Sequence, residues 1–341
     1  MSGTRKLALV IGATGGIGGA TTKALLAHGW RVRALTRDVA RACRDFAALG
    51  PIDWVAGDAM DRAAMVAAAQ GTLLIVHGAN PPGYRNWRGL ALPMLENSIA
   101  AAKASGARLV LPGNVYNFGP DAFPVADEQS PQHPLTRKGA VRVEMEAMLR
   151  RAAAEGVHSL IVRAGDYFGA NAPSSWFENV LVKPGKPVGA VTYPGSREVG
   201  HCWAYLPDLG EAIAQLAALD DSLADCETVH FGGYWLERGD EIAHSVRRVV
   251  GRLDLPIRAF PWPVVYLAAP FVTMFREMLE MRYLWRKPLR LDNRKLLGLL
   301  GTEPHRPLDE AIRRTLVGLG CLPQNQNETV RESTLAATPT R

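Results

Sequence analysis

Short apolar segments alternate with longer helical segments through the first half of the chain. The apolar segments cover residues 7–11, 31–36, 53–56, 73–77, 108–111 and 158–163, and each has the length of one buried strand. Helical patterns fill several of the intervals, at 20–28, 62–70 and 92–105. Strands alternating with helices predict an α/β protein with a doubly wound parallel sheet and right-handed crossovers.

The pattern changes after residue 169. Residues 172–203 are rich in Pro, Trp, Phe and Gly, and they contain no long helical stretch. Further on, 228–231 predict a strand, and 238–250, 293–300 and 307–317 predict helices. We expect a first domain over 1–170, completed by parts of 200–232, and a smaller substrate-binding region over 171–322. The segment 323–341, rich in Asn, Glu, Thr and Ser, is expected to be a disordered tail.

The apolar side chains after residue 170 could serve either the core or a binding site. Trp176 and Phe177 could form the apolar wall of a substrate site or pack in the core. Residues 261–281 are the most apolar stretch outside the predicted sheet. Their Met and Phe residues favour a core or a hydrophobic pocket, while the nearby basic residues leave contact with a membrane surface open; these are Arg276, Arg282, Arg286, Lys287 and Arg290.

Glycines spaced three apart follow the first predicted strand. Gly12 permits a tight turn, Gly15 permits close approach of the backbone to a pyrophosphate, and Gly18 lets the next helix pack tightly on the sheet. The first N–H groups of that helix would then face the phosphates. Because strand, turn and helix occur in this order within thirty residues, the segment predicts a dinucleotide site. The alternative is a glycine-rich turn without a ligand.

The end of the second predicted strand bears on the choice of cofactor. An acidic residue there holds the ribose 2′-hydroxyl of NAD, whereas an arginine accommodates the 2′-phosphate of NADP. This chain has Arg37, with Arg41 one helical turn on. The guanidinium of Arg37 favours NADP over NAD. In the alternative, Arg37 is a solvated loop residue and Asp38 contacts the ribose.

Composition narrows the class of protein. The 341 residues are 48% hydrophobic and 21% charged, with a net charge of +6. These are ordinary values for a globular protein that binds an anionic cofactor, and no basic run interleaved with aromatic residues argues for nucleic acid. The four cysteines show no metal-ligand spacing, and neither a signal peptide nor a membrane-spanning segment is indicated. We expect a cytoplasmic protein without a metal site or stable membrane insertion. A homodimer stays open as its oligomeric state.

The segment GATGGIGG, with its GxxGxxG spacing, resembles the short-chain dehydrogenase/reductase superfamily, and it is closest to the extended and atypical branches. The resemblance implies a Rossmann fold and further elements of the cofactor site: the GD-x-x-D stretch beside the adenine, the backbone after the fourth strand beneath the ribose, and the turn after the sixth strand beside the carboxamide. His77, at the end of the fourth strand, is interpreted as a packed residue, with a catalytic role as the alternative. The implied cofactor-binding residues are Gly12, Thr14, Gly15, Gly16, Ile17, Gly18, Asp58, Ala59, Ala79, Asn80, Ala164 and Gly165. Asp61 is expected to cap the helix at 62–70. The segment 201–213, HCWAYLPDLGEAI, resembles the family's VDDxAxAI element, which implies a strand and then a helix to residue 219 with Asp208 as its N-cap. Tyr167 and a loop with Tyr84, Trp87 and Arg88 are expected near the substrate; in the alternative, the loop residues only cover the sheet.

Two departures affect the expected chemistry. Relatives read SSxxVYG after the fifth strand, where a hydroxyl polarises the substrate oxygen; this chain has Pro112 and Gly113, which leaves Asn114 and Tyr116 as candidates to orient that oxygen. The tyrosine of the superfamily's YxxxK motif is missing between residues 131 and 149.

In place of YxxxK, the chain carries Lys138, Arg142 and Glu146 at spacings of four, which put all three on one helix face. The pattern resembles the KxxxR helix of isoflavone reductase-like members, whose lysine performs the acid–base step. The resemblance makes Lys138 the candidate catalytic residue, and a ribose contact is also expected of it. The alternatives are a solvated stripe of charges and a lysine that only binds ribose.

These observations favour an NADP-dependent oxidoreductase acting on a small, largely apolar carbonyl, enone or imine substrate. Two alternatives stay open. One is a sugar-nucleotide epimerase or dehydratase, which the missing tyrosine argues against. The other is a non-catalytic regulator that senses NADP, which the same loss would suit.

Overall fold

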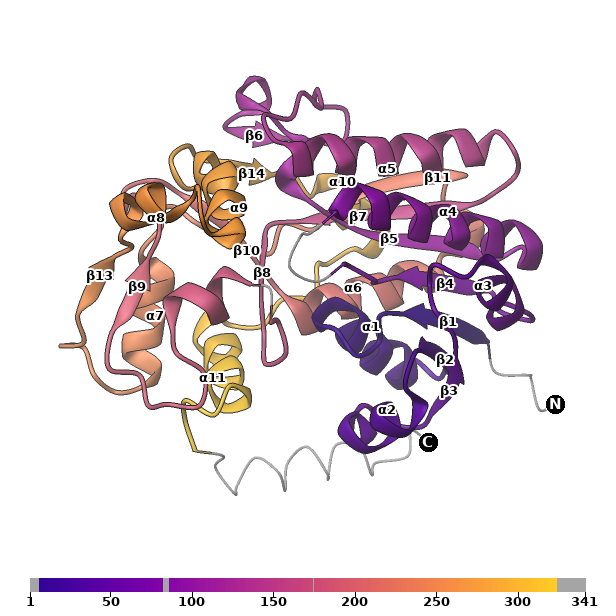
Figure 1. Cartoon of the computed structure of the whole chain (residues 1–341), viewed down its shortest axis with the longest axis horizontal. Helices are drawn as coiled ribbons and strands as arrows, with labels where there is room; N and C mark the ends of the chain where they lie inside the picture. Colours follow the sequence, from indigo (N-terminus) through magenta and orange to yellow (C-terminus); the bar gives the residue numbers. More distant parts are fainter. Residues whose placement is uncertain (1–5, 82–85, 174, 324–341) are drawn as a thin grey trace.

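A seven-stranded sheet forms the centre of the computed structural model, which describes residues 6–81, 86–173 and 175–323. All neighbouring strands are parallel, in the order β11-β7-β5-β4-β1-β2-β3 (Figure 1). The strands are β1 (Leu7–Ile11), β2 (Arg31–Thr36), β3 (Ile52–Ala56), β4 (Leu74–His77), β5 (Arg108–Asn114), β7 (Ser159–Ala164) and β11 (Cys226–His230). The predicted doubly wound α/β sheet is confirmed.

Helices cover both faces of this sheet. On one face α1 (Gly16–Ala27), α6 (Leu206–Ala218) and α10 (Arg294–Leu300) contribute Leu25, Leu209 and Leu296 to a fully buried core. On the other face α3 (Arg62–Ala68), α4 (Trp87–Ser105) and α5 (Arg137–Ala153) pack through side chains such as Leu95 and Leu149. The short α2 (Val39–Asp45) follows β2. Three layers therefore fix the carboxyl ends of the strands along one edge.

The remaining elements form a second lobe, at the left of Figure 1, that lies beyond this edge. It contains the short strands β8 (Asp166–Phe168), β9 (Val191–Tyr193), β10 (His201–Tyr205), β12 (Tyr234–Leu236) and β13 (Ile257–Ala259), and the helices α7 (Glu241–Val249), α8 (Trp262–Ala268), α9 (Thr273–Met281) and α11 (Leu308–Gly318). An aromatic core that includes Phe168, Phe177 and Trp203 holds it together. The strands β6 (Val125–Ala126) and β14 (Arg290–Leu291) pair above it.

Several element boundaries differ from the predictions. Helix α1 begins at Gly16 rather than at residue 20, because Gly15 already adopts the extended backbone of an N-cap. Helix α4 begins at Trp87 rather than at 92, so the prediction that Trp87 and Arg88 lie in a loop was wrong. Strand β5 extends through Pro112 and Gly113 to Asn114.

The prediction that Asp208 caps a helix was also wrong. Tyr205 is the N-cap of α6, and Asp208 lies inside the first turn, where it is buried. Its carboxylate accepts a hydrogen bond from the backbone N–H of Arg306 at 2.9 Å and pairs with the Arg306 side chain. A buried carboxylate needs such a partner, and this one fastens the segment before α11 to α6.

Candidate cofactor and substrate site

The glycine turn after β1 is compact. Gly12 has φ of +81°, a conformation that L side chains rarely adopt. A Cβ atom on Gly18 would lie 2.1 Å from the carbonyl oxygen of Gly12, which is a clash. Helix α1 can therefore pack this closely against the turn only because residue 18 is glycine. Gly15 donates its N–H to the same carbonyl at 2.9 Å. The turn and the close packing predicted for Gly12 and Gly18 are both present.

The first turn of α1 is suited to an anion. Among the described residues, no side chain caps it, and the turn itself carries no acidic residue. Gly15 has an ordinary φ of −93°, and an added Cβ would come no closer than 3.3 Å to any atom outside its chain neighbours. The helix therefore presents backbone N–H groups beside a glycine whose own φ does not require glycine, which fits a diphosphate. Gly16 lies against the backbone of Asn171, whose side chain donates to the carbonyl of Thr14 at 3.5 Å.

Two segments are expected to contact the adenosine half of the cofactor. Arg37, directly after β2, is exposed, while the carboxylate of Asp38 accepts a hydrogen bond from the N–H of Arg41 at 2.9 Å as the cap of α2. Asp58 accepts from the N–H of Met60 at 2.9 Å. Asp61 caps α3 through the N–H groups of Ala63 and Ala64, as predicted.

The end of β4 combines a packed histidine with an exposed amide. His77 is buried and hydrogen-bonded through Nδ1 to the Ser98 hydroxyl at 2.7 Å; burial, with Arg142 nearby, lowers the pKa of His77 to about 3. The prediction of a packed histidine is confirmed. Ala79 is half-buried, and Asn80 accepts a hydrogen bond from the Trp87 indole at 2.9 Å. Tyr84 lies outside the described residues.

The end of β5 meets the turn after β7. Asn114 accepts the N–H of Tyr116 at 3.0 Å, and the Tyr167 hydroxyl donates to the carbonyl oxygen of Gly113 at 2.6 Å. Burial raises the pKa of Tyr167 to about 12, so its phenol stays protonated at neutral pH. A Cβ atom on Gly165 would lie 2.3 Å from the carbonyl oxygen of Cys202, because β10 runs directly beside this turn.

The three predicted residues of α5, Lys138, Arg142 and Glu146, point into the protein rather than into solvent. Lys138 and Glu146 are 5% and 2% exposed, and the Arg142 guanidinium lies 3.4 Å from the carbonyl oxygen of Pro112 and over the Trp87 ring. The interpretation as a solvated stripe is therefore wrong. Gly139 packs so closely against the backbone of Tyr116 that an added Cβ would lie 2.2 Å from its oxygen, which places the start of α5 at the carboxyl end of β5.

Lys138 is paired with a residue that the sequence did not identify. Its Nζ lies 2.9 Å from a carboxylate oxygen of Glu277 and 3.2 Å from the backbone oxygen of the same residue, on α9. Burial lowers the pKa of Lys138, and the Glu277 carboxylate opposes that shift. Beside it, Arg137 pairs with Glu280 at 2.8 Å. No local pattern could have indicated this contact, because the partners lie 139 residues apart.

Glu146 has a structural partner. Its two carboxylate oxygens accept hydrogen bonds from Nε and Nη2 of Arg163 at 2.9 and 2.6 Å, and both side chains are almost fully buried. Asn117 and Gln132 also donate to Glu146, at 2.9 and 3.1 Å. The remaining side of Arg163 contacts His230, whose pKa burial and Arg163 lower to about 3. This network joins α5, β7 and β11.

The candidate substrate aromatics lie in the second lobe. Phe177 is fully buried in its core, while Trp176 is partly exposed and contacts the rings of Trp262 and Trp285. A buried pair that the sequence did not predict lies nearby: His201 contacts Asp166 at 2.8 Å and stacks on Trp285. With Val115, the two line a cavity of about 10 Å³, which is the space of one water molecule.

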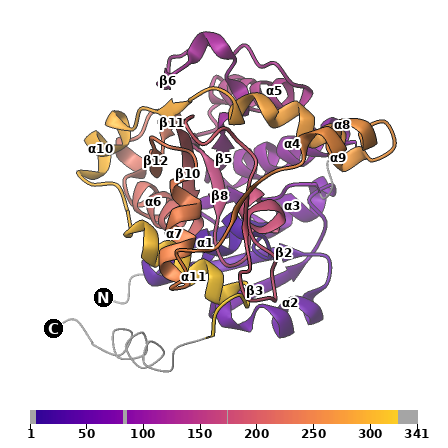
Figure 2. The same ribbon diagram turned by 90° about the vertical axis from the view of Figure 1, so that its left-hand side faces the viewer.

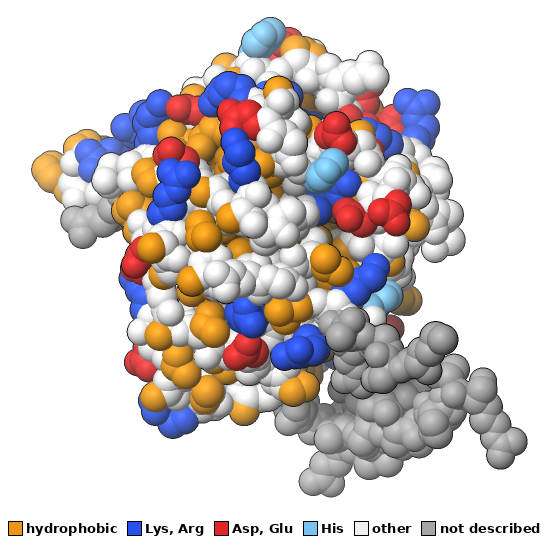
Figure 3. Space-filling view, turned by 90° about the vertical axis from the view of Figure 1, so that its right-hand side faces the viewer, with side chains coloured by type: hydrophobic (Ala, Val, Ile, Leu, Met, Phe, Trp, Pro, Cys, Tyr) orange, Lys and Arg blue, Asp and Glu red, His pale blue; other side chains and the backbone are white. Residues whose placement is uncertain are grey.

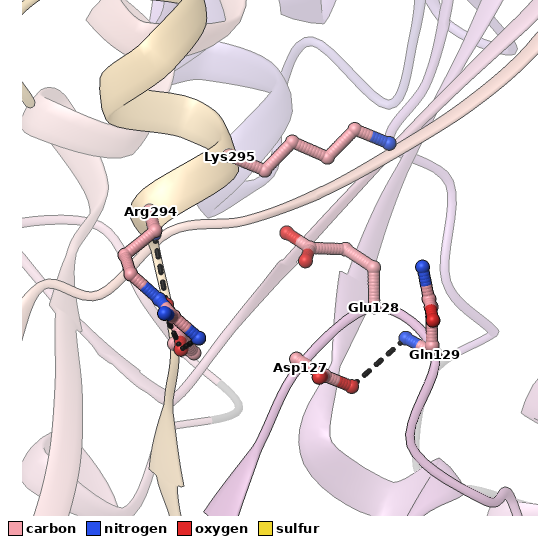
Figure 4. Close-up of a pocket in the computed structure, with 6 residues that line it drawn as sticks. Asp127, Glu128, Gln129, Arg294 and Lys295 are labelled. Atoms are coloured by element: carbon pink, nitrogen blue, oxygen red, sulfur yellow. Dashed lines mark hydrogen bonds and ion pairs between the residues drawn. The ribbon is translucent and has the colours of Figure 1, made fainter.

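A larger open pocket of about 500 Å³ lies elsewhere, between the loop after β6 and the start of α10 (Figure 4). Asp127, Glu128 and Lys295 are among its lining residues, and none of the predicted site residues is. In the part of the chain that the structure describes, no group of three or more His, Cys, Asp and Glu residues is arranged to hold a metal ion. Over residues 6–81, 86–173 and 175–323, no helix is long and apolar enough to cross a membrane.

Comparisons with known proteins agree with this geometry. Residues 12–180 match a family model described as NAD(P)H-binding. Among curated proteins, none matches the chain by sequence.

Solved structures share the whole architecture. A proposed epimerase from Burkholderia cenocepacia J2315 superposes with a TM-score of 0.74 at 19% identity, over 94% of this chain and 99% of that one. A UDP-glucose 4-epimerase from Bifidobacterium longum, in complex with NAD⁺ and UDP, gives 0.68 at 14% identity, over 93% and 98%. The dTDP-glucose 4,6-dehydratase DesIV from Streptomyces venezuelae, a double mutant with NAD bound, gives 0.67 at 19% identity, over 92% and 96%. The Rossmann fold that the resemblance implies is confirmed.

Proposed function

We propose that this chain, whose residues 12–180 form an NAD(P)H-binding domain on the fold of the extended short-chain dehydrogenases/reductases, is an NADP-dependent oxidoreductase. Its substrate is a small, largely apolar carbonyl, enone or imine compound. The bound nicotinamide supplies or accepts the hydride. The residues of the chain bind and orient both reactants, and Lys138 transfers the proton.

The buried state of Lys138 carries this proposal. Its side chain is 6% exposed, and burial lowers its pKa from the usual lysine value. A lysine whose pKa lies closer to neutrality gives up and regains a proton more readily, as a general acid or base must. The start of α5 also lies beside Asn114 and Tyr116, where the reacting oxygen is expected.

Glu277 favours the positively charged form of Lys138. The carboxylate 2.9 Å from Nζ favours the ammonium form, which opposes the effect of burial. When the substrate is reduced, the Lys138 ammonium therefore donates a proton to it. The neutral amine is then reprotonated. Because Glu277 belongs to α9, the second lobe completes the catalytic unit.

NADP is favoured over NAD by the two residues after β2. Arg37 is exposed and offers a planar guanidinium to a 2′-phosphate, whereas the Asp38 carboxylate is engaged in capping α2. The domain arrangement proposed with this function assigns residues 1–170 to the cofactor and most of 171–322 to the substrate.

A second candidate is an epimerase or dehydratase acting on a sugar nucleotide. It is favoured by the solved structures with this fold, which include a UDP-glucose 4-epimerase and a dTDP-glucose 4,6-dehydratase. The absence of a tyrosine from α5 argues against it.

Turnover assays distinguish these functions. Purified protein is titrated with NADPH and NADH, and NADPH consumption is then followed with carbonyl, enone and imine panels; UDP-glucose and dTDP-glucose are assayed separately for conversion. We expect turnover only with the first set. Conversion of a sugar nucleotide would support the second candidate, and tight NADPH binding without any turnover would support a regulator.

The role of Lys138 is tested on the best substrate from that panel. Lys138→Met should lower kcat at least about a hundred-fold, since general acid catalysis contributes that much, while the Kd for NADPH stays within a few-fold. Arg137→Met is the matched control, because Arg137 is the neighbouring cation on α5 and is 80% exposed. Unchanged turnover in Lys138→Met would show that another group moves the proton.

A further inference from the structure

Helices α8 and α9 form a hairpin that projects from the second lobe (Figures 1 and 2). Its outer end exposes large apolar side chains: Leu267 is 79% exposed and Phe271 is 88% exposed. The same stretch also exposes Val264, Tyr266, Val272 and Met274. Six exposed large apolar residues within eleven positions exceed the scattered apolar residues normal on a monomer surface. Phe271 and Met274 are therefore neither core residues nor the lining of a pocket, the two roles favoured for this segment from the sequence.

The acidic and basic residues of the hairpin and of the segment after it differ in their exposure to solvent. Glu277 and Glu280 are the only acidic residues within 262–290, all of which the structure describes, and they are 12% and 20% exposed because they pair with Lys138 and Arg137. Basic residues of the same segment, such as Arg276, Arg286 and Lys287, are exposed. Among the exposed side chains of 262–290, the charged ones are thus all basic.

The end of the molecule at the right of Figure 1 carries charges of both signs on its surface. Figure 3 shows Lys and Arg side chains interspersed with Asp and Glu there. The segregation of charge is a property of the hairpin rather than of the whole surface.

The hairpin is attached firmly at its base. The Trp262 indole donates to the backbone oxygen of Pro194 at 2.7 Å, and the Arg282 guanidinium donates to the Tyr266 hydroxyl at 2.6 Å while lying over the Trp262 ring. These contacts fix the orientation of the exposed end and place an arginine beside it.

We propose that the α8–α9 hairpin binds the surface of an anionic lipid bilayer. The exposed Leu267 and Phe271 side chains enter the boundary between headgroups and acyl chains, as apolar side chains of interfacial helices do. The flanking arginines and lysine contact lipid phosphates. Glu277 and Glu280 add little repulsion to that contact, because they pair with Lys138 and Arg137. Such binding is peripheral and needs no membrane-spanning helix.

Vesicle co-sedimentation of the full chain tests the proposal. The probes are vesicles of pure phosphatidylcholine and vesicles in which about a third of the lipid is phosphatidylglycerol. We expect the protein to sediment with the anionic vesicles and to bind pure phosphatidylcholine at least about ten-fold more weakly. The double variant Leu267→Ser/Phe271→Ser should lose at least about ten-fold in affinity for the anionic vesicles.

Two further variants separate charge from apolar contact. Arg276→Gln/Arg286→Gln should weaken anionic binding about thirty-fold, which is the effect expected for two cations at such a surface. The control Leu73→Ser/Leu253→Ser removes exposed leucines elsewhere, which are 51% and 70% exposed, and should bind as the wild type does.

Two outcomes overturn the proposal. One is equal sedimentation with both kinds of vesicle, or none with either. The other is that Leu267→Ser/Phe271→Ser converts a dimer into a monomer in size-exclusion chromatography with light scattering but does not change vesicle binding. That second outcome would assign the hairpin to contact with a second copy of the chain.

Discussion

Replacing Glu146 by glutamine should destabilise the protein more than any neighbouring surface change. The variant keeps the shape of the side chain but leaves the Arg163 guanidinium, 1% exposed, without its opposite charge. Breaking a buried ion pair from one side costs about 3–5 kcal/mol. The estimate applies here because the pair is bidentate and the two carboxylate oxygens also accept hydrogen bonds from Asn117 and Gln132.

Urea denaturation followed by circular dichroism measures this loss. The midpoint should fall with little change in the denaturant slope, since the same surface unfolds. Glu155→Gln is the matched control, because its carboxylate pairs with Lys103 at the surface, and it should leave the midpoint unchanged. Glu146→Leu combined with Arg163→Met should recover most of the stability. A loss below about 1 kcal/mol in Glu146→Gln would refute the assignment of a buried charged pair.

The remaining predictions concern cofactor choice and pH. Arg37→Ser should weaken NADPH about ten- to a hundred-fold in isothermal titration, as expected for a lost charged hydrogen bond, and leave NADH within about two-fold; Arg44→Ser on α2 is the control, and equal losses for both nucleotides would remove the 2′-phosphate argument. Stability should decline as pH falls from 6.5 toward 3, because His77 and His230 are held neutral in the folded state, each with a pKa of about 3, and take up protons on unfolding. The slope should reach about 1.4 kcal/mol per pH unit for each histidine; His77→Gln should flatten it, whereas the exposed His133→Gln should not, and a flat wild-type profile would contradict this account.

Features that depend on neighbouring residues could be predicted from the sequence. The main strands and the turn at Gly12 follow from short apolar runs and glycine spacing, and Asp61 was recognised as a cap because capping is local. The spacing of Lys138, Arg142 and Glu146 correctly indicated one helix face. Local patterns could not say which way that face points.

Features that depend on tertiary packing could not be predicted. Glu277 reaches Lys138 only because the fold brings α9 to the first turn of α5. Asp208 pairs with Arg306, 98 residues away, for the same kind of reason. Helix starts at Gly16 and Trp87 were missed because residues with weak helix propensity are accepted where the sheet supports them.

NADPH titration of the wild type and of Gly15→Val is the most direct test of the central claim, which is that the first turn of α1 binds the diphosphate of the cofactor. The φ of −93° at Gly15 is one that valine adopts, but an added Cβ would lie 3.3 Å from the carbonyl oxygen of Gly12, so a thermal unfolding curve first establishes that the variant folds. The valine side chain then occupies the space expected for the phosphates. We predict saturable binding to the wild type and affinity at least about a hundred-fold lower in Gly15→Val. Wild-type affinity in the folded variant, or a wild type that binds neither NADPH nor NADH, would contradict the account.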